Sequence, residues 1–227
     1  MIYLTVTAHP DDEVLGFGAT SYILSQNNHT VYNVILSGNV DARRHRPDID
    51  ALTAHTNNAQ QLIGAEPPIL GPFPNIKFNT VPHLELVQFI EKHIEELQPD
   101  YVFTHHPYDL NNDHYHVSKA CQAAVRLSQR KPVKPVKGLY FMEVPSSTDW
   151  AFPVDGQTFQ PNTFIEVGER GVAKKIEALG AYEGVMRPYP HPRSDEAITG
   201  LAAYRGGQAG VKYAEAFQLV YQVNNFT

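Results

Sequence analysis

Strand-like and helix-like segments alternate along the first two thirds of the chain, and this alternation constrains the fold more than any other feature. The apolar runs at residues 2–7 and 30–36 are each followed along the chain by a longer segment with helical periodicity. Such alternation is typical of a parallel sheet with helices on its faces. The sequence therefore predicts an α/β fold, a three-layer α/β/α sandwich with a mostly parallel, Rossmann-like sheet.

The expected elements cover most of the chain. Strands are expected over residues 2–7, 30–36, 99–104, 138–143, 163–167 and 217–223, and helices over 13–26, 48–63, 84–97, 115–128, 170–182 and 194–204. The Pro-rich stretch 67–82 is compatible with a short strand at 69–70 without requiring one. A chain of 227 residues is long enough to bury a complete core, so residues 1–227 are expected to form a single domain.

Composition limits the partners that this chain can have. A formal net charge of -6 argues against nucleic acid or an acidic membrane surface as the main partner. The lone Cys121 excludes an intramolecular disulfide and fits a reducing compartment. No apolar stretch approaches the roughly 20 residues of a membrane span, and the N-terminus lacks the pattern of a signal peptide. We expect a cytoplasmic protein without a membrane span that acts on a small molecule and could form a homo-oligomer.

An acidic turn follows the first predicted strand. Residues 8–13 read Ala-His-Pro-Asp-Asp-Glu and open the first predicted helix. Turns at this position cradle phosphate when they are rich in glycine, but here the carboxylates would repel an anion. His9 offers a nitrogen and Asp12 a carboxylate oxygen to a divalent cation, while Asp11 between them is left for another task. A helix N-cap would explain one or two of the aspartates but not the whole turn.

A second histidine-rich segment, residues 105–114, follows the strand expected over 99–104. In open α/β sheets ligands bind at the carboxyl ends of the strands, so both segments are expected at the same edge. A catalytic zinc site takes three protein ligands, and His105, His106 and His114 compete for the third place. We favour His114 because a helix would hold it. The sequence does not give the strand order, so it leaves open whether the two segments are neighbours.

These motifs resemble those of the PIG-L or LmbE-like zinc-dependent N-deacetylases. The resemblance covers residues 8–13, 99–107, 109–114, 143–150, 190–194 and 204–217. It implies Zn²⁺ or another divalent metal held by His9, Asp12 and His114, with Asp11 as the general base. It also implies an enzyme that removes an N-acetyl group from an amino sugar or sugar conjugate. Two alternatives remain open: a zinc amidohydrolase acting on a non-sugar amide, and a noncatalytic binding protein with the same fold.

One position departs from the family pattern. Many members read His-Pro-Asp-His where residues 111–114 read Asn-Asn-Asp-His. Asn111 can donate a hydrogen bond to a substrate but cannot shuttle a proton. Another group must then act as the acid, and His191 is the first candidate. The alternative is that His191 is a residue of a rigid surface loop without a catalytic role. The candidates for substrate binding are Arg43, Asn111, Arg193 and Arg205.

Overall fold

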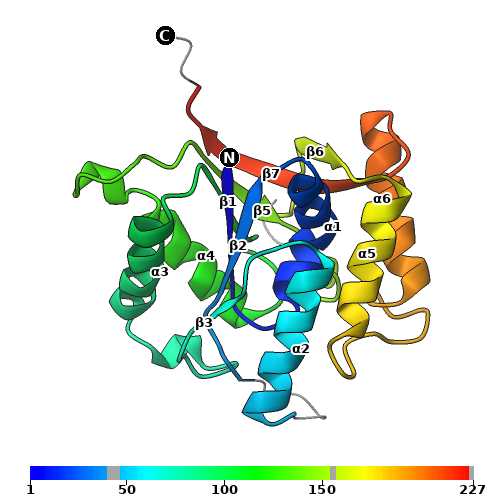
Figure 1. Ribbon diagram of the computed structural model, residues 1–227, viewed down its shortest axis with the longest axis horizontal. Coiled ribbons are helices and arrows are strands. Elements are labelled where there is room, and N and C mark those ends of the chain that lie inside the picture. The colour runs from blue at the N-terminus through cyan, green and yellow to red at the C-terminus, as the bar shows by residue number, and fades with distance from the viewer. Residues whose placement is uncertain (40–46, 154–156, 225–227) are drawn as a thin grey trace.

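The computed structural model describes residues 1–39, 47–153 and 157–224 and is built around a seven-stranded sheet (Figure 1). The strands are β1 (Ile2–Thr7), β2 (Thr30–Ile35), β3 (Ile69–Leu70), β4 (Tyr101–His105), β5 (Gly138–Met142), β6 (Thr163–Glu166) and β7 (Ala214–Gln222). Their order across the sheet is β3-β2-β1-β4-β5-β7-β6. The first five strands in this order are parallel, and β7 runs antiparallel to both of its neighbours. The predicted mostly parallel sheet is confirmed.

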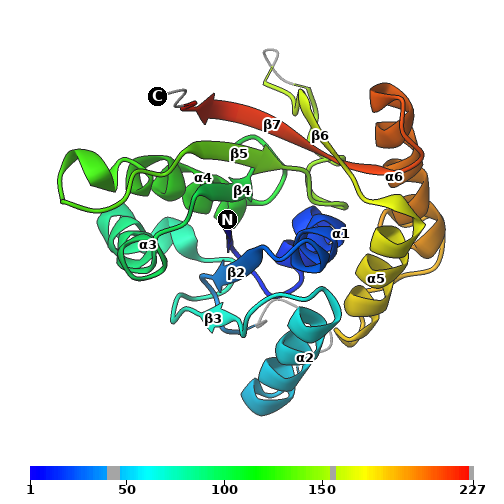
Figure 2. The same ribbon diagram turned by 45° about the horizontal axis from the view of Figure 1, so that its top comes forward.

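Helices cover both faces of the sheet and complete three layers (Figure 2). They are α1 (Asp12–Gln26), α2 (Ile49–Leu62), α3 (His83–Leu97), α4 (Asn112–Ala124), α5 (Gly168–Gly180) and α6 (Asp195–Ala209). One apolar cluster joins the sheet to α3 and α4, and a second joins it to α1, α2, α5 and α6. The sandwich predicted from the alternating pattern is therefore observed. None of the described helices is both long and apolar enough to cross a membrane.

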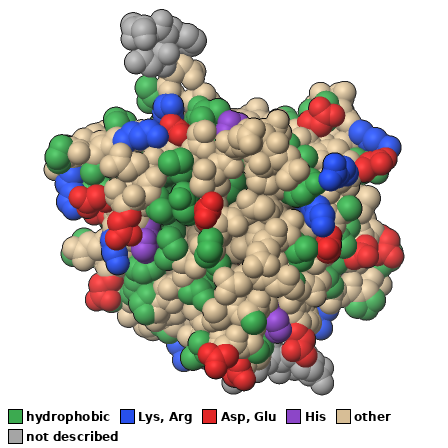
Figure 3. Space-filling view, in the orientation of Figure 1, with side chains coloured by type: hydrophobic (Ala, Val, Ile, Leu, Met, Phe, Trp, Pro, Cys, Tyr) green, Lys and Arg blue, Asp and Glu red, His purple; other side chains and the backbone are tan. Residues whose placement is uncertain are grey.

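Both faces of the sheet are buried, and apolar residues of β1 point alternately to the two faces. On β1, Leu4 and Val6 enter the cluster beneath α3 and α4, whereas Tyr3 packs against the other cluster. This period of two is expected for a strand. On the face shown in Figure 3, the acidic and basic side chains lie mainly toward the margins, where red and blue groups are neighbours at several places.

The predicted element boundaries differ from the observed ones mainly at α4, α6 and β7. Helix α6 extends to Ala209 instead of ending at residue 204, and α4 ends at Ala124 instead of residue 128. Helix α4 begins at Asn112, earlier than residue 115, because Oδ1 of Asn111 accepts the N–H of Asp113 at 2.9 Å and caps the helix. Strand β7 begins at Ala214 instead of residue 217. The short strand at 69–70 forms, and it pairs with the end of β2.

The order of the strands answers the question that the sequence left open. Strand β1 lies between β2 and β4, and Val6 pairs with Thr104, so β1 and β4 end at the same level. The turn after β1 and the loop after β4 are therefore neighbours at the carboxyl edge of the sheet. This is the position in which open α/β sheets bind ligands.

Candidate metal centre and active site

Three donor atoms from the segments after β1 and β4 converge at this edge. His9 lies in the turn after β1, Asp12 is the first residue of α1, and His114 lies in the first turn of α4. Oδ2 of Asp12 is 3.3 Å from Nδ1 of His9 and 3.2 Å from Nε2 of His114. One ligand atom from each residue lies within 4.8 Å of the other two. These three side chains, which we call the metal-ligand cluster, could hold a metal ion.

Two further carboxylates fix the orientation of the imidazole rings. Nε2 of His9 donates a hydrogen bond to Oδ2 of Asp113 at 3.0 Å, and Nδ1 of His114 donates to Oδ2 of Asp109 at 2.7 Å. Each bond leaves the other ring nitrogen turned toward Asp12. Histidines that bind metals are usually held in this way by a carboxylate or carbonyl behind them.

Carboxylates surround the cluster, and one of its ring nitrogens has no hydrogen-bond partner among the described residues. His114 is 1% exposed, and within the described part of the chain its Nε2 has no hydrogen-bond partner. Burial alone would lower the pKa of His114, but the carboxylates of Asp109 and Asp12 raise it to about 10. Burial would likewise raise the pKa of Asp12, yet the positive charge of His114 holds it well below its usual value. A buried nitrogen without a partner among carboxylates fits a divalent cation with nitrogen and oxygen ligands.

Asp11 lies beside the metal-ligand cluster in a strained backbone conformation. Its φ of 107° falls in the left-handed region, which costs a residue other than glycine about 1–3 kcal/mol. Its Oδ2 accepts a hydrogen bond from Nη1 of Arg193 at 3.0 Å, and Nε of Arg193 donates to Oγ of Ser146 at 2.7 Å. Residues that the surrounding structure holds under strain are concentrated at functional sites.

A buried polar network holds the backbone of Asp11. Oε2 of Glu13 accepts the N–H of Asp11 at 3.0 Å, while Oε1 accepts hydrogen bonds from Nε2 of Gln60 and from the hydroxyl of Tyr182. Burial raises the pKa of Glu13 to about 7. Gln60 in turn accepts a hydrogen bond from Asn33 on β2. Residues from α2, from β2 and from the segment after α5 therefore fix the shape of the turn.

The metal-ligand cluster and Asp11 line an open pocket of about 440 Å³. The other residues that line it are Asn75, Ile76, Leu110, Asn111, Asn112, Ser146, Ser147, Trp150 and Arg193. The sequence analysis missed Asn75, which comes from the Pro-rich stretch, and Ser147 after β5. The possible strand at 69–70 was the one available signal for Asn75, because a loop after a parallel strand reaches this edge.

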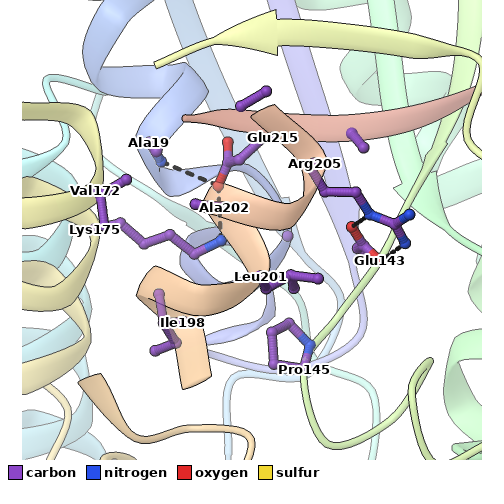
Figure 4. A pocket seen from close by; sticks show the side chains of 13 residues that line it. Ala19, Glu143, Pro145, Val172, Lys175, Ile198, Leu201, Ala202, Arg205 and Glu215 are labelled. Carbon is purple, nitrogen blue, oxygen red and sulfur yellow. Dashed lines mark hydrogen bonds and ion pairs between the residues drawn. The ribbon is translucent and has the colours of Figure 1, made fainter. Parts of the chain in front are cut away.

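Two of the four predicted substrate-binding residues line this pocket. They are Asn111, whose amide oxygen caps α4, and Arg193, which binds Asp11. Arg43 lies outside the described residues. Arg205 is placed elsewhere: it lines a different pocket, where its guanidinium forms two hydrogen bonds with the carboxylate of Glu143 at 2.8 and 2.6 Å (Figure 4). The geometry therefore does not bring Arg205 to the metal-ligand cluster.

His105, the last residue of β4, and His106, which follows it, have structural contacts. Nε2 of His105 accepts the N–H of Ala8 at 2.8 Å, and its ring stacks on His114 at 3.6 Å between centroids. Burial and His114 lower the pKa of His105 to about 3. His106 packs among the rings of Tyr108, Phe141 and Phe159. Neither lines the pocket that Asp11 occupies.

His191 lies close to this pocket without lining it. Its ring packs edge-on against Trp150 at 5.4 Å, and Trp150 lines the pocket. Nδ1 of His191 accepts the N–H of Arg193 at 3.1 Å, so the neutral ring carries its proton on Nε2. Burial and the neighbouring Arg193 lower the pKa of His191. The predicted role of His191 as an acid stays a prediction.

Solved structures with the same fold include proteins of different activities. The conserved protein TT1542 from Thermus thermophilus is 22% identical, with 98% of this chain and 96% of that chain covered at a TM-score of 0.77. N,N'-diacetylchitobiose deacetylase from Pyrococcus horikoshii is 20% identical, with 100% and 87% covered and a TM-score of 0.77. The 4-carboxy-2-hydroxymuconate hydratase GalB from Pseudomonas putida is 20% identical, with 100% and 98% covered and a TM-score of 0.79. At these identities the likeness shows the fold.

Sequence comparison gives the family. No curated protein matches the chain. The family model PIG-L, described as GlcNAc-PI de-N-acetylase, matches residues 4–125. This span contains the metal-ligand cluster, Asp11 and the loop after β4. Because it covers more than half of the 227 residues, the chain belongs to the PIG-L family.

Proposed function

We propose that this protein is a metal-dependent N-deacetylase that hydrolyses the N-acetyl group of an amino sugar or sugar conjugate. The observation that carries the proposal is the convergence of Nδ1 of His9, Oδ2 of Asp12 and Nε2 of His114 next to Asp11 in an open pocket. The description of the family as GlcNAc-PI de-N-acetylase supports the class of substrate. Residues 1–227 would act as one catalytic domain, because strands from both ends of the chain share one sheet.

The proposed metal is Zn²⁺, held by His9, Asp12 and His114. Two imidazoles and one carboxylate are a ligand set typical of catalytic zinc, which keeps one position open. When bound, such a metal supplies Lewis-acid polarisation of the amide carbonyl and acidifies water. Asp109 and Asp113 would keep the two imidazoles turned toward the ion.

Asp11 is the proposed general base. It would take a proton from the attacking water as the water oxygen bonds to the carbonyl carbon. Nη1 of Arg193 would hold the carboxylate in place, and the hydrogen bond from the Asp11 N–H to Glu13 would keep the backbone in its strained turn. Asn111, at the pocket wall, can donate a hydrogen bond to the substrate.

The amine must gain a proton as the C–N bond breaks. Asp11, once protonated, lines the pocket and can return that proton to the nitrogen. His191 is the other proposed donor, although it lies behind Trp150. A His191→Ala variant that retains the parent rate across the pH range would leave Asp11 as the donor.

The identity of the substrate can be tested directly. Zinc-loaded protein is incubated with N-acetylglucosamine, with N-acetylglucosamine conjugates and with simple N-acetyl amino acids, and the released acetate is measured. We expect acetate from the sugars in proportion to bound metal, and none from chelator-treated protein. Acetate from the amino acids alone would favour the non-sugar amidohydrolase. No acetate from any substrate would contradict the proposal and direct attention to other chemistry on this fold, such as the hydratase activity named for GalB.

The compartment is a further proposal. Cys121 is a buried free thiol on α4, and burial raises its pKa to about 12. A thiol of this kind fits the reducing cytoplasm. We expect Cys121 to resist alkylating reagents in the native protein and to react fully in denaturant.

A further inference from the structure

A second hollow continues the candidate active-site pocket across the loop between β4 and α4. Its volume is about 310 Å³, and it shares Leu110, Asn111 and Asn112 with that pocket. Beyond these residues the hollow is lined by Pro107, Tyr108, Asp109, Tyr115, Phe152 and Gln157. A substrate bound next to Asp11 could therefore extend into this hollow without leaving the protein surface.

The two tyrosines are placed as a pair and remain open to solvent. Tyr108 is 41% exposed and Tyr115 is 42% exposed. Nζ of Lys119 lies 5.9 Å from the ring centroid of Tyr108 and 5.7 Å from that of Tyr115, so one cation bridges both rings. Tyrosines that build the core, such as Tyr182, are almost fully buried.

Hydrogen bonds hold the loop beneath these rings in one shape. The N–H of Leu110 donates to the carbonyl of Ser147 at 3.1 Å, and the N–H of Asn111 donates to Oδ1 of Asp109 at 2.9 Å. The same Asp109 binds His114 of the metal-ligand cluster. The loop that lines the hollow is therefore tied to His114 of the proposed catalytic centre through Asp109, and a preorganised surface loses less entropy when a ligand binds.

We propose that this hollow is a subsite for a second sugar ring of the substrate, an inference that rests on the proposed function. Tyrosine rings with exposed surface offer apolar area to the C–H face of a sugar ring. The amides of Asn112 and Gln157 beside them can donate to and accept from hydroxyl groups. A lipid tail would desolvate these amides without giving them partners. The substrate is then an N-acetylated amino sugar within a disaccharide or a longer glycan.

The test compares one sugar with two. Acetate release by the zinc-loaded protein is measured with N-acetylglucosamine and with N,N'-diacetylchitobiose, and the ratio of their kcat/KM values is determined. We expect the disaccharide to be preferred by about tenfold or more. Tyr115→Ala and, separately, Tyr108→Ala should each reduce this ratio by about three- to tenfold, the value of one aromatic contact. Tyr204→Ala, which removes a 61% exposed tyrosine from α6, serves as the matched control and should leave the ratio unchanged.

Binding measurements separate failure of the subsite from failure of the proposed function. If no acetate is released from either sugar, the Kd of each is measured by calorimetry on the zinc-loaded protein. Tighter binding of the disaccharide that Tyr115→Ala abolishes would support the subsite and contradict the deacetylase. Equal Kd values for the two sugars, or a kcat/KM ratio that neither tyrosine variant changes, would overturn the subsite.

Discussion

Two groups of buried and half-buried charged residues lie at the carboxyl edge of the sheet, and they differ in how their charges are paired. In the metal-ligand cluster, acidic groups surround two imidazoles, and Nε2 of His114 has no hydrogen-bond partner among the described residues. In the second group, which we call the Lys175 cluster, Lys175 pairs with Glu215 at 2.7 Å and Arg205 pairs with Glu143 at 2.6 Å (Figure 4). The second group pairs each cation with one carboxylate, whereas the first brings nitrogen and oxygen donor atoms to one point, a set that could hold a metal ion.

The Lys175 cluster also supports the backbone of α1. Glu215 accepts the N–H groups of Ala19 and Thr20, in the middle of the helix whose first residue is Asp12. Its charges thus serve to join β7 and α5 to α1. The comparison teaches that buried charge alone does not mark a site. A site is indicated where nitrogen and oxygen donor atoms from separate elements converge on one point beside an open pocket.

The largest expected effect is loss of the metal. Replacing His114 by Ala removes one of the three proposed ligands and should reduce bound zinc from about one equivalent to a small fraction, measured by metal analysis after dialysis. His116→Ala, two residues further along α4, is the matched control and should retain the metal. Normal zinc content in a folded His114→Ala variant would show that the convergent donors do not form the metal site.

Next in size is the effect on turnover without loss of metal. Asp11→Asn keeps the shape of the side chain but removes the proposed base, so kcat should fall by roughly 10²- to 10⁴-fold while zinc stays bound. Asp12→Asn should instead weaken zinc binding. The reverse outcome, an empty site in Asp11→Asn and a full one in Asp12→Asn, would exchange the two assignments.

The sequence predicted the candidate metal ligands better than it predicted the residues that contact them. His9, Asp12 and His114 could be placed at one sheet edge because each follows a strand, but only the pairing of β1 with β4 brings them together. Glu13 accepts hydrogen bonds from Gln60 and Tyr182. Both residues are distant from Glu13 in the sequence, and no sequence pattern predicted these contacts.

Local sequence patterns likewise could not predict that a charged side chain forms an ion pair with a residue distant in the sequence. Arg205 lies in a segment that resembles the family, and this suggested a role in substrate binding. The structure pairs it with Glu143, which lies 62 positions earlier in the sequence. The fold class needed only the alternation of strands and helices, which is a local property, and it was predicted correctly.

The Lys175 cluster should affect stability and leave the metal in place. Glu215→Ala leaves the ammonium of Lys175, whose side chain is 8% exposed, without its partner. The free energy of unfolding should fall by about 3–5 kcal/mol, measured by denaturant titration. Two further variants should each recover part of this loss. Lys175→Met combined with Glu215→Ala removes the unpaired ammonium, and Glu215→Gln in place of Glu215→Ala restores a hydrogen-bond acceptor. If Glu215→Ala stayed folded but lost zinc, the two clusters would be coupled and the distinction between them would fail.

The smallest expected effect is on stability and concerns a third group of charged residues. This group, formed by Asp100 with Lys134 and Lys137, lies at the edge of the sheet opposite the carboxyl edge. Asp100 accepts the N–H of Ile2 and pairs with Lys134 at 2.9 Å and Lys137 at 2.8 Å. Burial would raise the pKa of Asp100, but Lys137, the Ile2 N–H and Lys134 together hold it well below its usual value.

Because its folded pKa is depressed, Asp100 contributes stability above its unfolded pKa of about 4, and this contribution is lost as the pH falls below that value. The lysine partners are partly exposed, so Asp100→Asn should lower the free energy of unfolding by only about 1 kcal/mol at pH 7. The difference between parent and variant should shrink as the pH is lowered from 4 toward 2, while zinc content at pH 7 stays unchanged.

Glu177→Gln, which removes the exposed pair with Lys174, should produce almost no change at either pH. A difference between parent and Asp100→Asn that stays constant down to pH 2 would mean that the carboxylate charge is not what stabilises this edge.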